Sequence, residues 1–195
     1  MFPKATLKEA GAAREQVPAG NHVCRCYLIV DLGDQVKTWQ GEEKIRREIL
    51  IGFELCAETM TDGRPFAVSS TYTLSLSERA NLRRVLEGWR GRPFTDQELT
   101  GFAIENLLGK PAMVQVSHRL AANGKTYTNI QTVSAMPKGL QAPEAVNPLT
   151  LYSPEYHDAD AWDRLPEWVQ RRVSERVNVS DTLPSGKFDD DEIPF

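Results

Sequence analysis

The apolar residues of this chain change their period twice, and those changes constrain the fold more than any single motif. Five stretches alternate with period two and therefore predict strands: residues 24–33, 44–55, 64–76, 111–120 and 125–136. Between the third and fourth stretches, residues 77–89 and 95–109 carry apolar side chains at helical spacing. The expected order is three strands, a helical insert and two more strands.

The same alternation predicts which side chains are buried. The first strand is expected to bury one face consisting of Cys24, Cys26, Leu28, Val30 and Leu32. The third strand is expected to bury Phe66, Val68, Tyr72, Leu74 and Leu76. Ser77 is the predicted N-cap of the first helix, and Thr95 with Glu98 matches a capping box for the second helix, which Gly109 ends.

Five strands with a helix between the third and fourth is the strand order of an OB-fold, a five-stranded β-barrel. We therefore predict a mainly β OB-fold barrel, whose closure would also remove exposed edge strands. The expected boundaries are an N-terminal arm over 1–21, the barrel over 22–140, and a linker with a short helix over 141–177. Residues 178–195 are small, polar and charged, and we expect them to be disordered until bound.

Composition limits the class of protein and the cellular compartment that can be expected. Hydrophobic residues make up 41% of the 195 positions, enough for a core, and no apolar run approaches the ~18 residues of a membrane span. The first residues lack the apolar core of a signal peptide, and three cysteines fit a reducing compartment, so a cytoplasmic protein is expected. Residues 1–139 hold 18 basic and 15 acidic side chains, net +3, whereas residues 140–195 hold 5 and 12, net −7.

No catalytic constellation is recognisable. The chain has no phosphate-binding G-x-x-x-x-G-K-[ST] motif, and its three histidines are scattered. Cys24 and Cys26 have no second cysteine or histidine pair at zinc spacing, so they are expected to be buried strand residues. We predict a non-enzyme without cofactor or metal.

The candidate binding residues follow from the physics of single-stranded nucleic acid, which needs a basic groove and aromatic faces for unstacked bases. In OB-folds the binding face comprises strands two and three and the loops joining strands one to two and four to five. Ten residues at those places and on the outer face of the first strand are the predicted DNA contacts: Arg25, Tyr27, Lys37, Trp39, Lys44, Arg46, Arg47, Arg119, Lys125 and Tyr127. For Trp39, stacking on a base and folding back over the barrel end both stay open.

The chain ends FDDDEIPF, an acidic run followed by an apolar tip. Such a tip can enter a small pocket while its carboxylates pair with basic residues at the rim. It resembles the C-terminal tip of bacterial single-stranded DNA-binding proteins. The resemblance implies that replication, recombination and repair enzymes are recruited by seven residues: Asp189, Asp190, Asp191, Glu192, Ile193, Pro194 and Phe195.

The stretches YLIVDLGDQ, LLGKPAMVQVSH and GKTYTNIQTVSAMPKG, together with the segment from DGRPFAVSS to GRPFT, cover much of residues 20–140. They resemble OB-fold single-stranded DNA-binding proteins encoded by bacteriophages, and LPEWVQRRV resembles that group too. The resemblance implies sequence-independent DNA binding and protection in phage replication and recombination, inside a bacterial host cell. It does not fix an oligomeric state.

Two other functions stay open at the level of sequence. The chain could be a recombination accessory that anneals strands or loads a recombinase. It could also be an OB-fold adaptor that uses its tail and the helix at 165–177 to bind proteins without touching nucleic acid.

Overall fold

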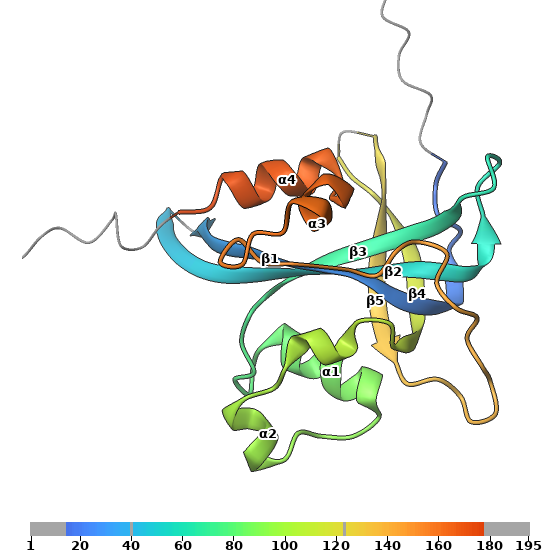
Figure 1. Ribbon diagram of the computed structural model, residues 1–195, viewed down its shortest axis with the longest axis horizontal. Coiled ribbons are helices and arrows are strands. Elements are labelled where there is room, and N and C mark those ends of the chain that lie inside the picture. Colours follow the sequence, from blue (N-terminus) through green and yellow to red (C-terminus); the bar gives the residue numbers. More distant parts are fainter. Residues whose placement is uncertain (1–14, 40, 123, 178–195) are drawn as a thin grey trace, which may run out of the picture.

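Two long strands form the centre of a single sheet (Figure 1). β1 (Gly20–Trp39) and β2 (Glu42–Thr59) pair antiparallel, and β3 (Pro65–Thr73) extends the sheet beyond β2. On the other side of β1 lie β4 (Pro111–Leu120) and then β5 (Thr126–Ser134), also antiparallel. The order across the sheet is β3-β2-β1-β4-β5 in this computed structural model.

The structure describes residues 15–39, 41–122 and 124–177. Within them a sixth strand, β6 (Thr150–Tyr152), runs parallel to β1 at Leu28–Val30. Because β2 occupies the opposite edge of β1, β6 continues the edge that β4 leaves after Arg25. This strand lies within residues 141–177, which were predicted to be a linker with a short helix.

The outer strands β3 and β5 are not joined by a ladder in the described part of the chain, so the sheet is open. The mainly β architecture is confirmed, but the predicted closure into a barrel is wrong. In place of a β3–β5 ladder there is a hollow, which residues of α1 line together with both outer strands. The backbone N–H of Ala135, just after β5, donates to the carbonyl of Gly88 in α1 at 3.0 Å, which ties β5 to the helix.

The helices cover the two faces of the central strands (Figure 1). The insert between β3 and β4 contains α1 (Asn81–Arg90), α2 (Asp96–Thr100) and the 3-10 helix η1 (Ile104–Leu107) on one face. On the opposite face lie α3 (Ala159–Arg164) and α4 (Glu167–Ser174). None of the described helices has the length and apolar character to cross a bilayer.

The helix starts test the capping predictions. The capping box of Thr95 and Glu98 is confirmed at the start of α2. Ser77 is not the cap of α1, because the chain makes a turn over 77–80 and the helix begins only at Asn81. Ala80 occupies the cap position and supplies no side-chain hydrogen bond.

Two apolar clusters lie on opposite faces of β1 and β2. The first packs against α1 and includes Cys24, Cys26, Ile29, Phe53 and Leu86. The second packs against α3 and α4 and joins Leu28, Val30, Leu32, Leu50, Leu165, Val169 and Val173. The single buried face predicted for the first strand is therefore wrong.

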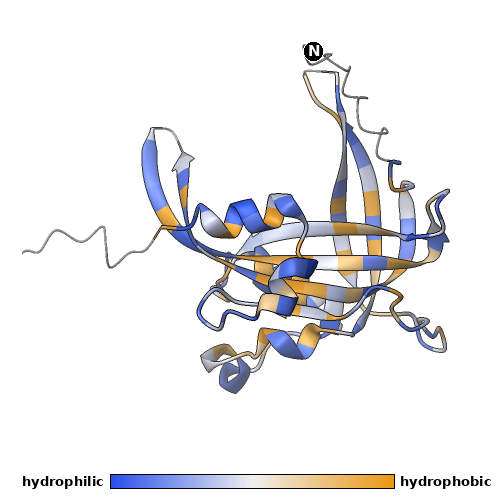
Figure 2. Cartoon of the chain, turned by 45° about the horizontal axis from the view of Figure 1, so that its top comes forward, coloured by the Kyte–Doolittle hydropathy of each residue, from blue (hydrophilic) through white to orange (hydrophobic). Residues whose placement is uncertain are grey.

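A bulge explains the division of that face. The register between β1 and β2 shifts between Cys26 and Leu28, so Tyr27 is an extra residue that reverses which side later residues face. In β3, Phe66, Val68 and Tyr72 are buried as predicted, whereas Leu74 lies beyond the strand and is exposed. Figure 2 shows apolar residues along the central strands and a hydrophilic tip on the hairpin that joins β1 to β2.

Candidate nucleic-acid interface

Two of the predicted contacts on β1 are engaged inside the protein. The Arg25 guanidinium donates to the carbonyls of Gly109 at 2.6 Å and of Ala142 and Pro143 at 2.7 Å each. Tyr27 is half-buried and packs against the cluster under α3 and α4. Arg25 thus fastens the segment after β5 across the sheet.

The β1–β2 hairpin was predicted to be basic, but its charges are balanced. Residues 34–48 carry four basic and four acidic side chains. The Lys37 ammonium lies 3.0 Å from Glu48, and that of Lys44 lies 3.1 Å from Glu42. Trp39 pairs with Glu42 through the backbone at the hairpin end, and its side chain falls outside the described part.

Arg47 is held by two carboxylates. Its guanidinium lies 2.5 Å from Asp31 and 2.7 Å from Glu155, which ties β2 to the segment after β6. Burial alone would raise the pKa of Asp31, but hydrogen bonds from Arg47, Gly33 and Ser153 and the charge of Arg47 outweigh it and lower that pKa. Hydrogen bonding to Asp31, followed by its charge and that of Glu155, raises the pKa of Arg47 above its ordinary value.

The remaining predicted residues lie toward the outer strands. Arg119 and Tyr127 face each other across β4 and β5, so their side chains share one face of that hairpin. Both are exposed, as is Lys125 just before β5. Arg46 is exposed on β2 and lines a hollow beside the loop that follows β3.

A trough follows the open seam between β3 and β5. At one end, a hollow of about 480 Å³ lies between the first half of β3, the first half of β5 and α4. It meets a second hollow of about 760 Å³, which β3 and β5 share with α1, at Ile130. Asn81 joins this second hollow to a third of about 570 Å³, lined by Arg46, Arg79 and the loop after β3.

The two strands that border the trough carry no carboxylate. The acid-free stretch around β3 runs from Gly63 to Ser77, and that around β5 runs from Asn106 to Pro143. Their lining side chains are mainly hydroxyls and amides: Ser69, Ser70, Thr73, Thr126, Thr128, Asn129, Gln131 and Thr132. Among the described residues, the acid that lines the trough is Glu15, at the α4 end. Such a surface can approach a polyanion without like-charge repulsion along its length.

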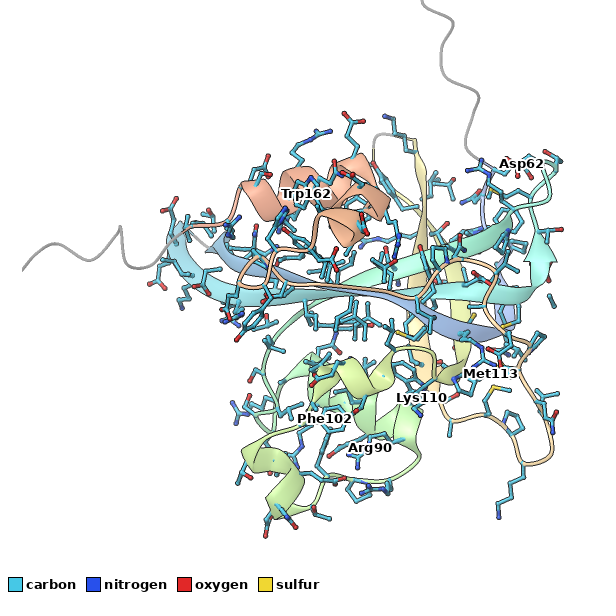
Figure 3. All side chains as sticks on the ribbon, viewed as in Figure 1. Asp62, Arg90, Phe102, Lys110, Met113 and Trp162 are labelled. Carbon is cyan, nitrogen blue, oxygen red and sulfur yellow. The ribbon has the colours of Figure 1, made fainter. Side chains whose placement is uncertain are left out.

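Three arginines stand at the α1 end of the trough. Arg46, Arg79 and Arg84 are exposed, and none forms an ion pair with a described residue. The Arg84 guanidinium donates to the Asn81 side chain at 2.7 Å, which holds it over the trough. By contrast, Arg90 and Arg92 pair with Glu98, and Arg90 lies over the rings of Phe94 and Phe102 (Figure 3).

Aromatic side chains stand at the other end. Tyr127 is 51% exposed and Trp168, on α4, is 45% exposed, and both line the 480 Å³ hollow. The buried residues of α4 are Val169 and Val173, and Trp168 lies outside that buried stripe. The trough thus has aromatic faces at one end and, at the other, guanidinium groups that no described carboxylate pairs.

Sequence reasoning missed Arg79, Arg84 and Trp168 as surface candidates. The signal that could have found the trough is the pair of acid-free stretches, since the chain has 27 Asp and Glu in 195 residues. The exposure of Trp168 had no sequence signal, because an aromatic residue at helical spacing is also what a buried stripe shows.

No protein-family model, curated protein or solved structure matched this chain. The acidic run and apolar tip, residues 189–195, lie outside the described residues.

Proposed function

We propose that this chain binds single-stranded DNA without sequence preference along the trough between β3 and β5. The observation that carries the proposal is the carboxylate-free seam, which leads to three arginines that no described carboxylate neutralises. Arg46, Arg79 and Arg84 would contact phosphates at the α1 end of the trough.

The strand order supports an OB-fold ancestry for this open sheet. The path β3-β2-β1-β4-β5, with the helical insert between β3 and β4, is that of an OB-fold in which the pairing of β3 with β5 is missing. The likeness of residues 20–140 to bacteriophage single-stranded DNA-binding proteins points the same way. The bound strand would then be coated and protected during replication or recombination.

The trough favours a single strand over a duplex. Its hydroxyl and amide side chains offer donors and acceptors to base edges that are exposed only in unpaired DNA. Its aromatic side chains offer faces on which any base can stack, which accounts for binding without sequence preference.

The acidic segment 189–195 is proposed to recruit replication, recombination or repair proteins to the coated strand. Its acids followed by Ile193, Pro194 and Phe195 support this role through their likeness to the bacterial tip. Removing residues 189–195 is expected to leave the affinity for DNA unchanged or raised and to abolish capture of the partner protein. Equal capture by the full and shortened chains would remove the docking role.

The binding proposal is tested by fluorescence anisotropy with a labelled oligo-dT at two salt concentrations. Wild-type affinity should fall as salt rises, since each phosphate contact releases counterions. The double variant Arg79→Ala/Arg84→Ala should bind more weakly and lower the slope of log affinity against log salt by about 1.4, at ~0.7 per phosphate contact. The matched control Arg64→Ala/Arg92→Ala removes the same charge from exposed arginines that are already paired with acids.

If both double variants lose the same affinity for oligo-dT, the loss comes from the change in net charge. That result would overturn the assignment of binding to the trough. If the wild type does not bind oligo-dT, the proposed function is rejected. The alternative that remains is a protein adaptor that does not touch nucleic acid. Annealing of complementary oligonucleotides, measured alongside, would separate a recombination accessory from simple coating.

A further inference from the structure

Trp168 differs from the other tryptophans whose side chains the structure describes. The Trp89 indole N–H donates to the carbonyl of Pro111 at 2.7 Å, and its ring packs edge-on against Phe53. Trp162, a residue of α3, packs against Tyr152 and His157 (Figure 3). The Trp168 ring contacts no other described aromatic ring, and its indole N–H donates to no described acceptor. Because the exposed Trp168 shares a hollow with the exposed Tyr127, the two rings together offer aromatic surface to a ligand.

The rigid support of Trp168 makes this exposure a fixed feature of the fold. Its neighbour Val169 is fully buried, and Val173 one turn later is 1% exposed. The N–H of Val177 donates to the carbonyl of Asp34 at 2.9 Å, which holds the end of the helical region against β1. α4 therefore presents Trp168 to the seam from a well-packed element.

The hollow beside Trp168 has the composition of a base site and lacks that of a phosphate site. Tyr127 lines it from β5, the buried Val17 and Val68 supply apolar surface, and Ser69 and Thr128 supply hydroxyls. No described Lys or Arg lines this hollow. Its one carboxylate, Glu15, accepts hydrogen bonds from the backbone and hydroxyl of Thr61 and would repel a phosphate.

We infer that the hollow between Trp168 and Tyr127 is a nucleobase subsite, in which one unstacked base of the bound strand lies against the Trp168 ring. This inference rests on the proposed binding of single-stranded DNA and deepens it, because it separates base contacts at the α4 end from phosphate contacts at the α1 end. It also makes α4, which follows the sheet in sequence, a part of the binding surface.

If bases bind at one end of the trough and phosphates at the other, the two ends contribute separately to the binding free energy. Stacking on an aromatic side chain acts on the base alone, whereas an arginine at a phosphate acts on the backbone whether or not a base is attached. The affinity for a strand that lacks bases should therefore not depend on Trp168 but should still depend on Arg79.

The test compares an oligo-dT with an abasic oligonucleotide of the same length, both labelled, on the full chain and three variants. Trp168→Ala should weaken oligo-dT binding about 5- to 150-fold, the equivalent of ~1–3 kcal/mol per stacked base, and leave abasic binding unchanged. Trp168→Phe should retain most of the oligo-dT affinity because it keeps an aromatic face. Arg79→Ala should weaken both oligonucleotides alike. Thermal unfolding of each variant checks that the fold is kept.

Equal affinity of Trp168→Ala and wild type for oligo-dT would overturn the base subsite while leaving the proposed function standing. Equal weakening of both oligonucleotides by Trp168→Ala would overturn it too, since that result marks a general effect on the surface. A wild type that binds neither oligonucleotide would remove the proposed function, and the subsite with it.

Discussion

A basic side chain binds a phosphate well only if a carboxylate of its own protein does not already match its charge. Arg46 and Arg47 show the difference within two adjacent residues. Arg47 pairs with Asp31 and Glu155, whereas Arg46 turns to the opposite face of β2 and lines the trough. Sequence reasoning selected both, because a basic residue on a strand reveals its charge and not its partner.

The buried carboxylate of Glu54 holds the segment after β5 in place. Glu54 is 1% exposed and accepts hydrogen bonds from the backbone N–H groups of Val146 and Asn147 and from the Asn147 side chain, at 2.6–2.7 Å. Glu54→Ala leaves these donors unpaired, so the free energy of unfolding should fall by about 3 kcal/mol.

Urea denaturation measures this change. The control Glu43→Ala, which removes an exposed carboxylate from the β1–β2 hairpin, should shift the free energy of unfolding by less than ~0.5 kcal/mol. An unchanged midpoint for Glu54→Ala would show that the segment over 141–149 is not anchored as described.

At the scale of elements, the sequence predicted what depends on local periodicity. The five strands, the helix predicted over 77–89 and found at Asn81–Arg90, and the capping box at Thr95 all follow from neighbours within a few residues. The bulge at Tyr27, the three-residue strand β6 and the open seam did not follow, because each is set by pairing between distant segments. Of the ten predicted DNA contacts, Arg46 and Tyr127 line the trough, whose position likewise depends on how distant segments are arranged.

The capping box of α2 should make stability depend on acid. A hydrogen bond from Arg92, aided by the Thr95 N–H and the charges of Arg90 and Arg92, holds the pKa of Glu98 at about 2. A folded-state pKa below the unfolded value means that this stabilisation is complete above pH ~4.5 and is lost as the pH falls toward 2.

Unfolding in urea at several pH values across this window tests the linkage. Wild type should lose stability more steeply with falling pH than Glu98→Gln, which cannot take up that proton. Parallel pH profiles for the two proteins would argue against the ionised capping box.

α4 is held by the second apolar cluster, so its packing can be weakened without replacing a residue that lines the trough. Val169→Ala removes two methyl groups from a fully buried position and should lower the free energy of unfolding by about 2 kcal/mol. Arg171→Ala, at an exposed position of the same helix, should change it by less than ~0.5 kcal/mol. Equal midpoints in urea would mean that α4 does not contribute to the cooperative fold.

At the scale of the whole molecule, charge is sorted along the chain and over the surface. Residues 1–139 are net +3, yet most of the cations of the β1–β2 hairpin are neutralised locally. The positive potential that remains is expected along the acid-free outer strands and at the arginines near α1. The open seam turns what would be a closed barrel wall into a groove with two unpaired strand edges.

Amide hydrogen exchange of the full chain with and without oligo-dT tests most directly whether single-stranded DNA binds in the trough between β3 and β5. Binding in the trough should slow exchange in β3, in β5 and around Arg79 to Arg84, and should leave the hairpin over residues 34–48 unchanged. Protection confined to that hairpin, or no protection anywhere in the presence of saturating oligo-dT, would contradict binding in the trough.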